Sequence, residues 1–442
     1  MEWITTEKEK ETWELKEILA EDAPGKRACV CGAVQRIRDM GEITFVILRK
    51  RDGILQTVFE RGNGPDPSVL SKEACVQISG VIRAETRAPG GRELYADGLR
   101  ILSRPDEPMP IAVSGKQSGA SLETRLDLRP LSLRGLRERA RFKIQEGVAR
   151  AFREYLQAEG FTEIHTPKIG ARGAEGGANL FRLEYFHRPA VLAQSPQFYK
   201  QMMAAVFERV MEIGPVFRAE KHNTRRHLNE YVSLDLEMAY LTDFTDLMRL
   251  ETGYLAYLTR LLSAEYAPEL SLLGVTLPQT DRIPAVRFSE ARRLAAEKYG
   301  VPIRSPYDLE PDEEQRIGRY FQEECGADFV FVTHYPSRKR PFYTMPSPED
   351  PEVTESFDLL FRGMEVTTGG QRIHDWKMLT ERIAARGMDT EGMEAYLSAF
   401  RHGMPPHGGL GIGLERMTMQ LLGEENVREV SLFPRDQRRL TP

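Results

Sequence analysis

The sequence predicts an α+β protein in which a small N-terminal β-barrel precedes a larger domain of antiparallel sheet and flanking helices. Three observations lead to this prediction. Short alternating apolar runs separated by turn residues occupy positions 26–103, and a polar stretch containing several prolines follows them. From about position 131, runs with helical spacing alternate with long strand-like runs. Strands and helices in this order are typical of an α+β domain.

The N-terminal region contains five short strand-like runs, CVCGAVQRI, ITFVILRK, LQTVFER, CVQISGVIRAE and ELYADGLRIL. Turn residues in RDMGE, RDG and APGG separate some of them. Five short strands in about 80 residues fit a small barrel such as an OB-fold, although the pattern alone also allows another small β domain. We therefore expect a domain at residues 1–104. A linker is expected at 105–130, where prolines and the stretch SGKQSGAS interrupt regular structure.

The larger domain is expected at residues 131–442. Its first helical run, LRGLRERARFKIQEGVARAFREYLQAEG, ends at Gly160, which suits a helix C-cap. The strand-like runs VMEIGPVF, YVSLDLEMAY and DFVFVTHY alternate with helical stretches at 242–265, 288–299 and 311–324. Near the C-terminus, the glycines of GGLGIGLERMTMQLLG lead into a further predicted helix.

Composition excludes several classes of protein. Across 442 residues, 61 Lys and Arg stand against 66 Asp and Glu, a net charge of −5 at pH 7. This balance argues against indiscriminate nucleic-acid binding, which needs a strong positive field. No apolar run approaches the ~20 residues of a membrane span, and the acidic N-terminus is unlike a signal peptide. Four cysteines (Cys29, Cys31, Cys75, Cys325) are too few for a disulfide framework, so we expect a reduced, cytoplasmic protein.

Charged residues cluster between apolar runs at positions suited to phosphate chemistry. The segment FRAEKHNTRRHLNEY concentrates arginines and histidines between two strand-like runs. Guanidinium groups pair bidentately with phosphate oxygens, so this loop suits a polyphosphate; charge alone favours a solvated hairpin tip. Asp358 and Glu365 are seven positions apart in FDLLFRGMEV, and two carboxylates beside a polyphosphate suggest a Mg²⁺ site. The sequence contains no GxxxxGK[ST], HExxH or GxSxG motif.

Three motifs together carry a resemblance to a known family. FTEIHTP (161–167), FRAEKHNTRRHLNEYVSLDLEM (217–238) and GLGIGLER (409–416) resemble, in order, the three signature motifs of class II aminoacyl-tRNA synthetases of subclass b. QSPQFYKQ (194–201), HNTRRHLNE (222–230), GGQRIH (369–374), GMPPHGG (403–409) and LFPRDQRRLTP (432–442) are similar to archaeal-type aspartyl-tRNA synthetases. The similarity covers nearly the whole chain, and the large insertion typical of the bacterial type is missing.

The resemblance implies ATP as a substrate and Mg²⁺ as its ion. The residues that would bind ATP are Arg218, Glu220, Arg226, His227, Tyr231, Glu365 and Arg416. Of these, Arg218 would hold the α-phosphate, and Arg218 and Arg416 would be the catalytic residues. Tyr231 and Arg416 would lie on opposite faces of the adenine, Arg416 through a cation–π contact. Asp358 and Glu365 would hold Mg²⁺.

The resemblance also implies L-aspartate as the amino acid. The residues that would bind it are Glu175, Ser195, Gln197, Lys200, Asp235, Thr368 and Arg372. Arg372 and Lys200 would pair with its side-chain carboxylate, and Asp235 and Glu175 would receive its ammonium group. Aspartate and asparagine are nearly isosteric, but an amide would leave a guanidinium charge uncompensated. We therefore expect aspartate, with an asparaginyl-tRNA synthetase as the alternative.

By the same resemblance, the barrel would read the tRNA anticodon. The residues matching the family are Gln35, Phe45, Gln56, Arg87 and Glu93. Phe45 would stack on a base, whereas Gln56 and Glu93 would read base edges; by pattern alone, Phe45 could instead be a core residue. Gln35 and Arg87 favour an enzyme restricted to tRNA(Asp). Ala33 stands where relatives usually carry Trp, which favours looser discrimination, so tRNA(Asn) is a second candidate partner.

The first signature motif forms a subunit interface in this family, so we expect a homodimer. Other functions remain open at this point. A paralogue could bind a nucleotide or RNA without charging tRNA, could make free asparagine, or could be a duplicate that confers resistance to an adenylate mimic. Retention of the barrel and of the motif arginines favours the charging enzyme.

Overall fold

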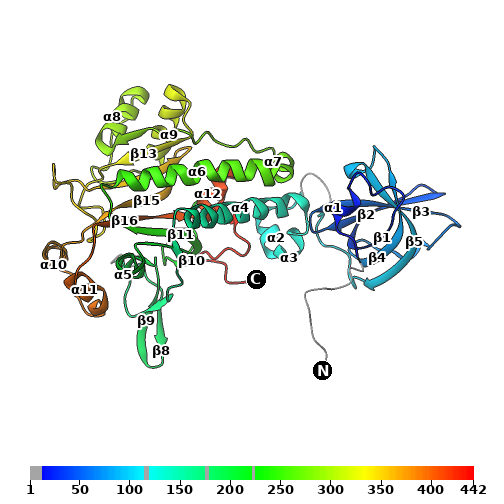
Figure 1. Ribbon diagram of the computed structural model, residues 1–442, viewed down its shortest axis with the longest axis horizontal. Helices are drawn as coiled ribbons and strands as arrows, with labels where there is room; N and C mark the ends of the chain where they lie inside the picture. The colour runs from blue at the N-terminus through cyan, green and yellow to red at the C-terminus, as the bar shows by residue number, and fades with distance from the viewer. Residues whose placement is uncertain (1–11, 114–118, 175–178, 222–223) are drawn as a thin grey trace. The chain divides into compact units, whose positions relative to one another are not determined.

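The computed structural model describes residues 12–113, 119–174, 179–221 and 224–442. The chain divides into two compact units, Met1–Glu138 and Arg139–Pro442, drawn in Figure 1. In the part of the chain that is described, none of the helices is both long enough and apolar enough to span a membrane.

The N-terminal unit contains the predicted barrel, which closes in the order β1-β2-β3-β5-β4. Its strands are β1 (Arg27–Asp39), β2 (Ile43–Lys50), β3 (Gly53–Glu60), β4 (Cys75–Ala84) and β5 (Arg92–Ser103). Side chains alternate between the two faces of a strand, so Val46 and Leu48 of β2 are fully buried inside the barrel. The short helix α1 (Leu15–Ile18) adds Leu15 and Ile18 to the same core. The prediction of a small closed β-barrel is therefore confirmed.

Two short helices lie in the second half of the segment expected to be a linker. They are α2 (Leu122–Asp127) and α3 (Arg129–Ser132). Ser121 caps α2, because its hydroxyl accepts a hydrogen bond from the backbone N–H of Thr124 at 3.1 Å. Arg129 is fully buried and lies 3.8 Å from Glu138. The segment is therefore ordered by capping and by a buried charge, which apolar periodicity does not reveal.

The second unit is built on an eight-stranded sheet in the order β12-β13-β14-β15-β16-β11-β10-β6. Its strands are β6 (Thr162–Glu163), β10 (Arg209–Phe217), β11 (Glu230–Ala239), β12 (Ala285–Arg287), β13 (Phe329–Thr333), β14 (Ser356–Phe361), β15 (Met364–Arg372) and β16 (His407–Gly413). Neighbouring strands are antiparallel except at the edges, where β12 pairs with β13 and β6 with β10 in parallel. The predicted antiparallel sheet is confirmed. The glycine-rich run before the last helix is strand β16, which the sequence did not predict.

One face of this sheet is apolar and is covered by two long helices, α4 (Leu136–Ala158) and α6 (Thr245–Glu265), which lie side by side in Figure 1. Phe152 of α4 and Tyr254 of α6 meet edge to face, with ring centroids 5.4 Å apart. Leu234 and Leu236 of β11 belong to the same core. This face holds the sheet together and leaves the opposite face for polar groups.

The opposite face carries charged residues because side chains alternate along each strand. On β11, Asp235 and Glu237 face away from the apolar core that Leu234 and Leu236 enter. A β-bulge between Leu359 and Leu360 shifts the pairing of β14 with β15, so that Glu365 lies opposite Leu360. A bulge re-aims side chains, and this one places Glu365 on the same face as Asp358.

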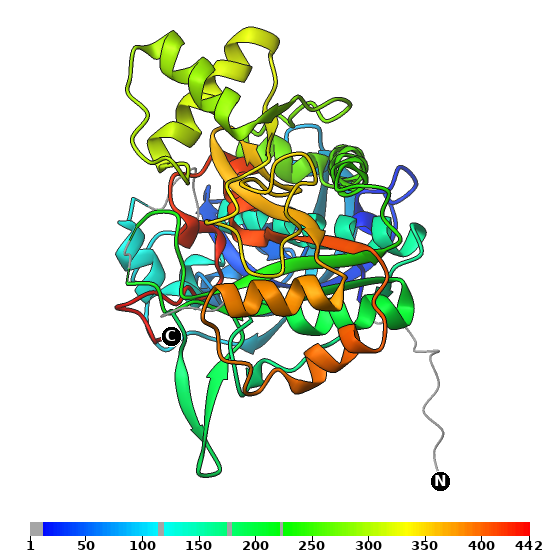
Figure 2. The same ribbon diagram turned by 90° about the vertical axis from the view of Figure 1, so that its left-hand side faces the viewer.

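The unit contains further helices and a small sheet. They are α5 (Gln197–Phe207), α7 (Ala267–Leu273), α8 (Phe288–Tyr299), α9 (Pro311–Cys325), α10 (Trp376–Ala385), α11 (Glu394–Arg401), α12 (Leu414–Leu422) and the small sheet of β7 (Ile169–Gly170), β8 (Arg182–Tyr185) and β9 (Arg188–Leu192). One of these helices, α7, packs beside α6 in the apolar core. The helices expected at 242–265, 288–299 and 311–324 correspond to α6, α8 and α9. The β8–β9 hairpin projects from its unit in Figure 2.

Candidate active site

Hydrogen bonds join the two ends of the charged loop between β10 and β11. The backbone N–H of Arg218 donates to the carbonyl of Asn229 at 2.9 Å, and the Asn229 amide donates back to the carbonyls of Arg218 and Glu220. The Arg218 guanidinium carbon lies 5.8 Å from the Tyr231 ring centroid. The structure thus brings Arg218, Glu220 and Tyr231 together. The side chain of Arg226 is only 15% exposed, so the alternative of a solvated tip is wrong for this residue.

Arg416 connects this loop to strand β15. It lies in the first turn of α12, directly after β16. Its Nε donates to the carbonyl of Arg226 and its Nη1 to the carbonyl of Glu365, both at 3.3 Å. His227 is on the same side of the loop, with its Nε2 3.9 Å from the Glu220 carboxylate. The residues predicted to bind ATP therefore form one cluster from three separated segments.

The two predicted Mg²⁺ ligands share one face of the sheet. Asp358 is 5% exposed, so it is no surface residue. Burial raises the pKa of the Asp358 carboxyl to about 6; Arg340 opposes this shift and the charge of Glu365 adds to it. Two carboxylates close enough to repel each other fit a divalent cation, and Mg²⁺ needs only one or two when phosphates complete its shell. Within the described ranges, no group of three or more His, Cys, Asp or Glu is arranged to hold a metal.

Lys200 and Arg372 lie in a buried network of alternating charges. Lys200 is 3% exposed, so it is no helix-surface lysine, and its Nζ donates to Asp235 Oδ1 at 2.8 Å. Its Nζ also lies 3.5 Å from Glu237 Oε2. Arg372 donates from Nε to Glu237 Oε1 at 3.0 Å and from Nη2 to the carbonyl of Gly409 at 2.9 Å. A Cβ at Gly409 would lie 2.1 Å from Glu237 Oε2, so the network requires glycine there.

The sequence reasoning missed Glu237 and His407. Glu237 is fully buried between both cations, and its position two residues after Asp235 on one strand could have placed it on the same face. His407 is also fully buried, with its Nε2 2.9 Å from the Gln201 amide nitrogen. Burial lowers the pKa of His407 to about 4, so the ring is neutral at pH 7 and adds no charge to the network.

Several polar atoms beside this network have no hydrogen-bond partner among the described residues. They are Gln194 Oε1, Ser195 Oγ and Gln197 Nε2, and all three are buried. Buried polar atoms are nearly always paired, so these point to a ligand. Thr368 lies between the two clusters. Its hydroxyl donates to Glu365 at 3.3 Å, and it lies opposite Gly411 of the neighbouring strand, which in turn lies opposite Asp235. The predicted ligand Glu175 falls outside the described residues.

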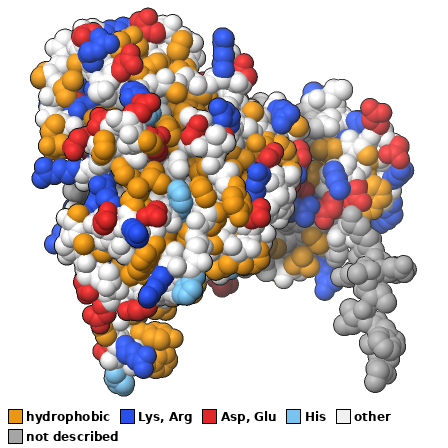
Figure 3. Space-filling model, turned by 60° about the vertical axis from the view of Figure 1, so that its left-hand side comes forward, with side chains coloured by type: hydrophobic (Ala, Val, Ile, Leu, Met, Phe, Trp, Pro, Cys, Tyr) orange, Lys and Arg blue, Asp and Glu red, His pale blue; other side chains and the backbone are white. Residues whose placement is uncertain are grey.

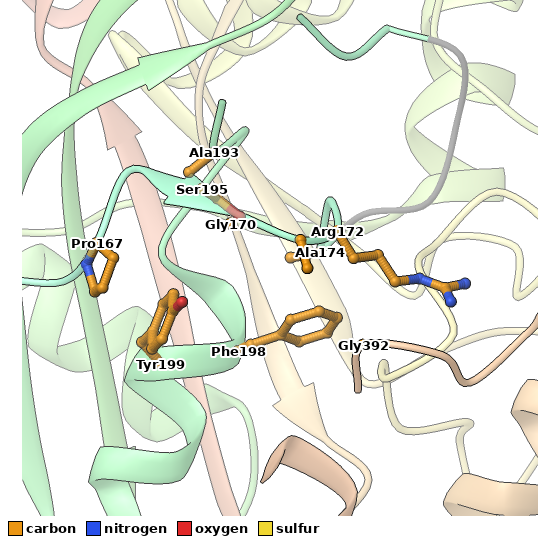
Figure 4. A pocket seen from close by; sticks show the side chains of 10 residues that line it. Pro167, Gly170, Arg172, Ala174, Ala193, Ser195, Phe198, Tyr199 and Gly392 are labelled. Atoms are coloured by element: carbon orange, nitrogen blue, oxygen red, sulfur yellow. The ribbon is translucent and has the colours of Figure 1, made fainter. Parts of the chain in front are cut away.

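A hollow that is open to solvent adjoins Ser195. Figure 4 shows Phe198 and Tyr199 of α5 below it and Arg172 at its rim. The hollow is lined by Pro167, Gly170, Ala171, Arg172, Ala174, Ala193, Ser195, Phe198, Tyr199 and Gly392. Buried polar atoms and an adjoining open hollow together indicate a small-molecule site.

In the barrel, three predicted anticodon readers share one outer face. Phe45 lies between the buried residues of β2 and is absent from the barrel core, so the core alternative is wrong. The amide of Gln56 donates to Glu93 at 2.8 Å across neighbouring strands. Glu93 is buried, at 5% exposed, and so is Gln35, at 8%, which lies at a bulge of β1. Arg87 is 88% exposed and pairs with Glu85 at 2.9 Å.

Comparisons with known families agree with this geometry. Residues 121–437 match the family model of class II tRNA synthetases for D, K and N. Residues 28–102 match the model of the OB-fold nucleic acid binding domain. The predicted OB-fold is therefore confirmed.

Individual relatives match over nearly the whole chain. The aspartate–tRNA(Asp/Asn) ligase of Deinococcus radiodurans is 46% identical, over 97% of this chain and 99% of that protein. The aspartate–tRNA(Asp) ligase of Pyrococcus horikoshii is 42% identical, over 96% and 98%. Among solved structures, the asparaginyl-tRNA synthetase of Pyrococcus horikoshii with asparaginyl-adenylate is 32% identical, with a TM-score of 0.90 over 98% of this chain and 100% of that chain. The chain belongs to the class II aminoacyl-tRNA synthetases of the aspartate, lysine and asparagine group, and within it to the aspartate–tRNA ligases.

Proposed function

We propose that the chain activates L-aspartate with ATP and transfers the aspartyl group to tRNA(Asp) and also to tRNA(Asn). The observation that carries the choice of aspartate is the buried network of Lys200, Asp235, Glu237 and Arg372. Its two cations and two carboxylates balance each other. Both amino acids carry an ammonium group and an α-carboxylate, and the α-carboxylate faces the α-phosphate of ATP. In the network itself, aspartate adds the ammonium and a side-chain carboxylate, which preserves the balance. Asparagine adds the ammonium without a side-chain charge and would leave a buried positive charge in excess there.

Neither chemical step needs a nucleophilic side chain. The α-carboxylate of aspartate attacks the α-phosphorus of ATP, giving aspartyl-adenylate and releasing pyrophosphate. A terminal ribose hydroxyl of the tRNA then attacks the adenylate carbonyl, and AMP leaves. The protein holds the reactants in line and stabilises the developing phosphate charge. Arg218 supplies the positive charge that stabilises the α-phosphate, and Tyr231 with Arg416 holds the adenine.

The fit of Asp358 and Glu365 supports Mg²⁺ as the ion of this site. Bound there with the phosphates of ATP, Mg²⁺ would neutralise part of their charge. Asp358 is held by Arg340, whose Nη2 lies 2.7 Å from its Oδ1. Arg340 and the Tyr335 hydroxyl both hydrogen-bond to this carboxylate, and these contacts fix its orientation.

The wider tRNA range rests on the barrel and on the relatives. Four proteins at 44–46% identity are named for both tRNAs. Gln35 is buried and the charge of Arg87 is engaged by Glu85, so neither is well placed to exclude an anticodon. Ala33 offers no aromatic ring. This proposal departs from the expectation drawn from Gln35 and Arg87.

The charging assay tests the proposal directly. Purified tRNA(Asp) and tRNA(Asn) are each incubated with ATP and labelled aspartate or, separately, labelled asparagine. We expect aspartate on both tRNAs and asparagine on neither. Aspartate on tRNA(Asp) alone would restrict the enzyme to one partner. Asparagine on either tRNA would overturn the charge-balance argument, and no charging at all would favour a paralogue with another role.

The protein is also proposed to act as a homodimer, supported by exposed apolar residues near the sheet edge. Strand β6, in the first signature motif, is the edge strand. At the adjacent end of β10 and β11, Val206 is 62% and Tyr240 68% exposed, and the backbone N–H of Ala239 donates to the carbonyl of Glu208. Hydrophobic side chains also gather at the hairpin tip in Figure 3, where Phe186 is 81% exposed. Such patches mark interfaces.

Light scattering at micromolar concentration is expected to give twice the mass of one chain. A monomer mass would contradict the dimer.

We further propose a cytoplasmic location, supported by the four cysteines, all of which are free thiols. Localisation of a tagged full-length chain to another compartment would contradict it.

A further inference from the structure

Glu314 of α9 closes a ring of contacts around the proposed ATP site. Its Oε2 accepts from Arg226 Nη2 at 2.6 Å and from the backbone N–H of Glu365 at 3.3 Å. Arg416 completes the ring through the carbonyls of Arg226 and Glu365. The four residues come from α9, the β10–β11 loop, β15 and α12, and Glu314 is 88 positions from Arg226. No sequence motif connects Glu314 with the other three.

The contacts of this ring provide hydrogen-bond acceptors for only some of the N–H donors of the Arg226 guanidinium. Its Nε is buried and has no hydrogen-bond partner among the described residues, whereas Nη2 is held by Glu314. Leaving a buried donor unpaired is costly, so the free N–H of Arg226 indicates a missing acceptor. A phosphate oxygen is the acceptor that arginine binds best.

Glu314 is not the residue that pairs α9 with α8. The neighbouring residue Glu313 forms a separate buried pair with Arg292 of α8 at 3.0 Å, and it caps α9 together with Glu310. A buried ion pair is weak evidence for stability, because desolvation offsets the attraction. Glu314 instead directs its carboxylate away from the α8–α9 pair, toward segments that the proposed function assigns to ATP.

We propose that Glu314 is a positioning residue for ATP, which acts by fixing the guanidinium of Arg226 against the phosphates. This inference rests on the proposed ATP site. An arginine side chain has many rotamers, and holding one of them before the ligand arrives lowers the entropy cost of binding. Helix α9, which packs against α8, thereby contributes a residue that positions the nucleotide.

A double-mutant cycle tests the inference. Glu314→Ala, Arg226→Ala and the double variant are compared in aspartate-dependent ATP–pyrophosphate exchange and in equilibrium binding of a non-hydrolysable ATP analogue. We expect Glu314→Ala to raise KM for ATP about tenfold and to leave KM for aspartate within about twofold. In the Arg226→Ala background, removal of Glu314 should add nothing, because its effect passes through Arg226. Glu314→Gln, which keeps an acceptor oxygen, should lie between Glu314→Ala and the unchanged protein.

Glu313→Gln is the matched control, since it alters a buried pair on the same helix. It should lower thermal stability and leave KM for ATP unchanged. An equal rise in KM for ATP in Glu313→Gln would assign the effect to helix packing and overturn the inference. So would unchanged analogue binding in Glu314→Ala. If the unchanged protein binds the analogue but shows no exchange with aspartate, the proposed function fails, and the binding measurements still decide the role of Glu314.

Discussion

Replacing Arg218 with alanine is expected to reduce aspartate-dependent ATP–pyrophosphate exchange by about 10²–10³-fold in kcat/KM. Arg218 begins the β10–β11 loop and lies beside Glu220 and Tyr231. Its charge is needed most as negative charge develops around the α-phosphorus, so its loss should raise the barrier of the first step. The loop itself should keep its shape, because Asn229 holds it through the backbone of residue 218.

Arg225→Ala is the control for this variant. Arg225 belongs to the same loop, but its side chain is 75% exposed and reaches Glu425 only at 3.4 Å. Exposed ion pairs contribute little to stability, so the ATP–pyrophosphate exchange rate of the Arg225→Ala variant should stay close to that of the unchanged protein. Substantial exchange in Arg218→Ala would show that the α-phosphate is held elsewhere. A loss of equal size in Arg225→Ala would point to the overall charge of the loop.

Arg372→Ala is expected to lower kcat/KM for aspartate by about 10²–10³-fold while binding of an ATP analogue is retained. The guanidinium supplies one of the two cations in the buried network, and without it the aspartate side chain enters a site with excess negative charge. Arg372→Lys keeps the charge but loses the fork that contacts both Glu237 and Gly409. It should therefore recover only part of the activity.

The thermal stability of the Arg372→Ala variant must also be measured, because this variant keeps Glu237 fully buried and takes away one of its two cationic partners, leaving Lys200. Breaking a buried pair costs about 3–5 kcal/mol. The double variant Arg372→Met with Glu237→Gln removes both charges and should regain thermal stability without regaining aspartate activation. Aspartate activation that survives in either variant would mean that another cation recognises the substrate.

Much of the architecture could be predicted from local patterns. Alternating apolar residues predicted the barrel strands, since burial of one strand face is a property of a few adjacent residues. Helical spacing likewise located α6, α8 and α9. The helices α2 and α3 were missed because a cap and a buried arginine define them. Strand β16 was missed because glycine has low strand propensity.

The sequence likewise predicted some residues of the candidate site, and only the structure placed the others. Motif resemblance selected Arg218, Lys200, Arg372 and Arg416, and alternation along β11 was sufficient to put Glu237 beside Asp235. No local pattern could place Glu365 on the face of Asp358, because a bulge between Leu359 and Leu360 does so. None could bring Glu314 to Arg226, because α9 reaches the loop only through packing on the sheet. The sequence by itself determined which strand and helix faces are apolar and which motifs are present. The tertiary structure decided which charges meet, because contacts between distant segments depend on strand register and helix packing.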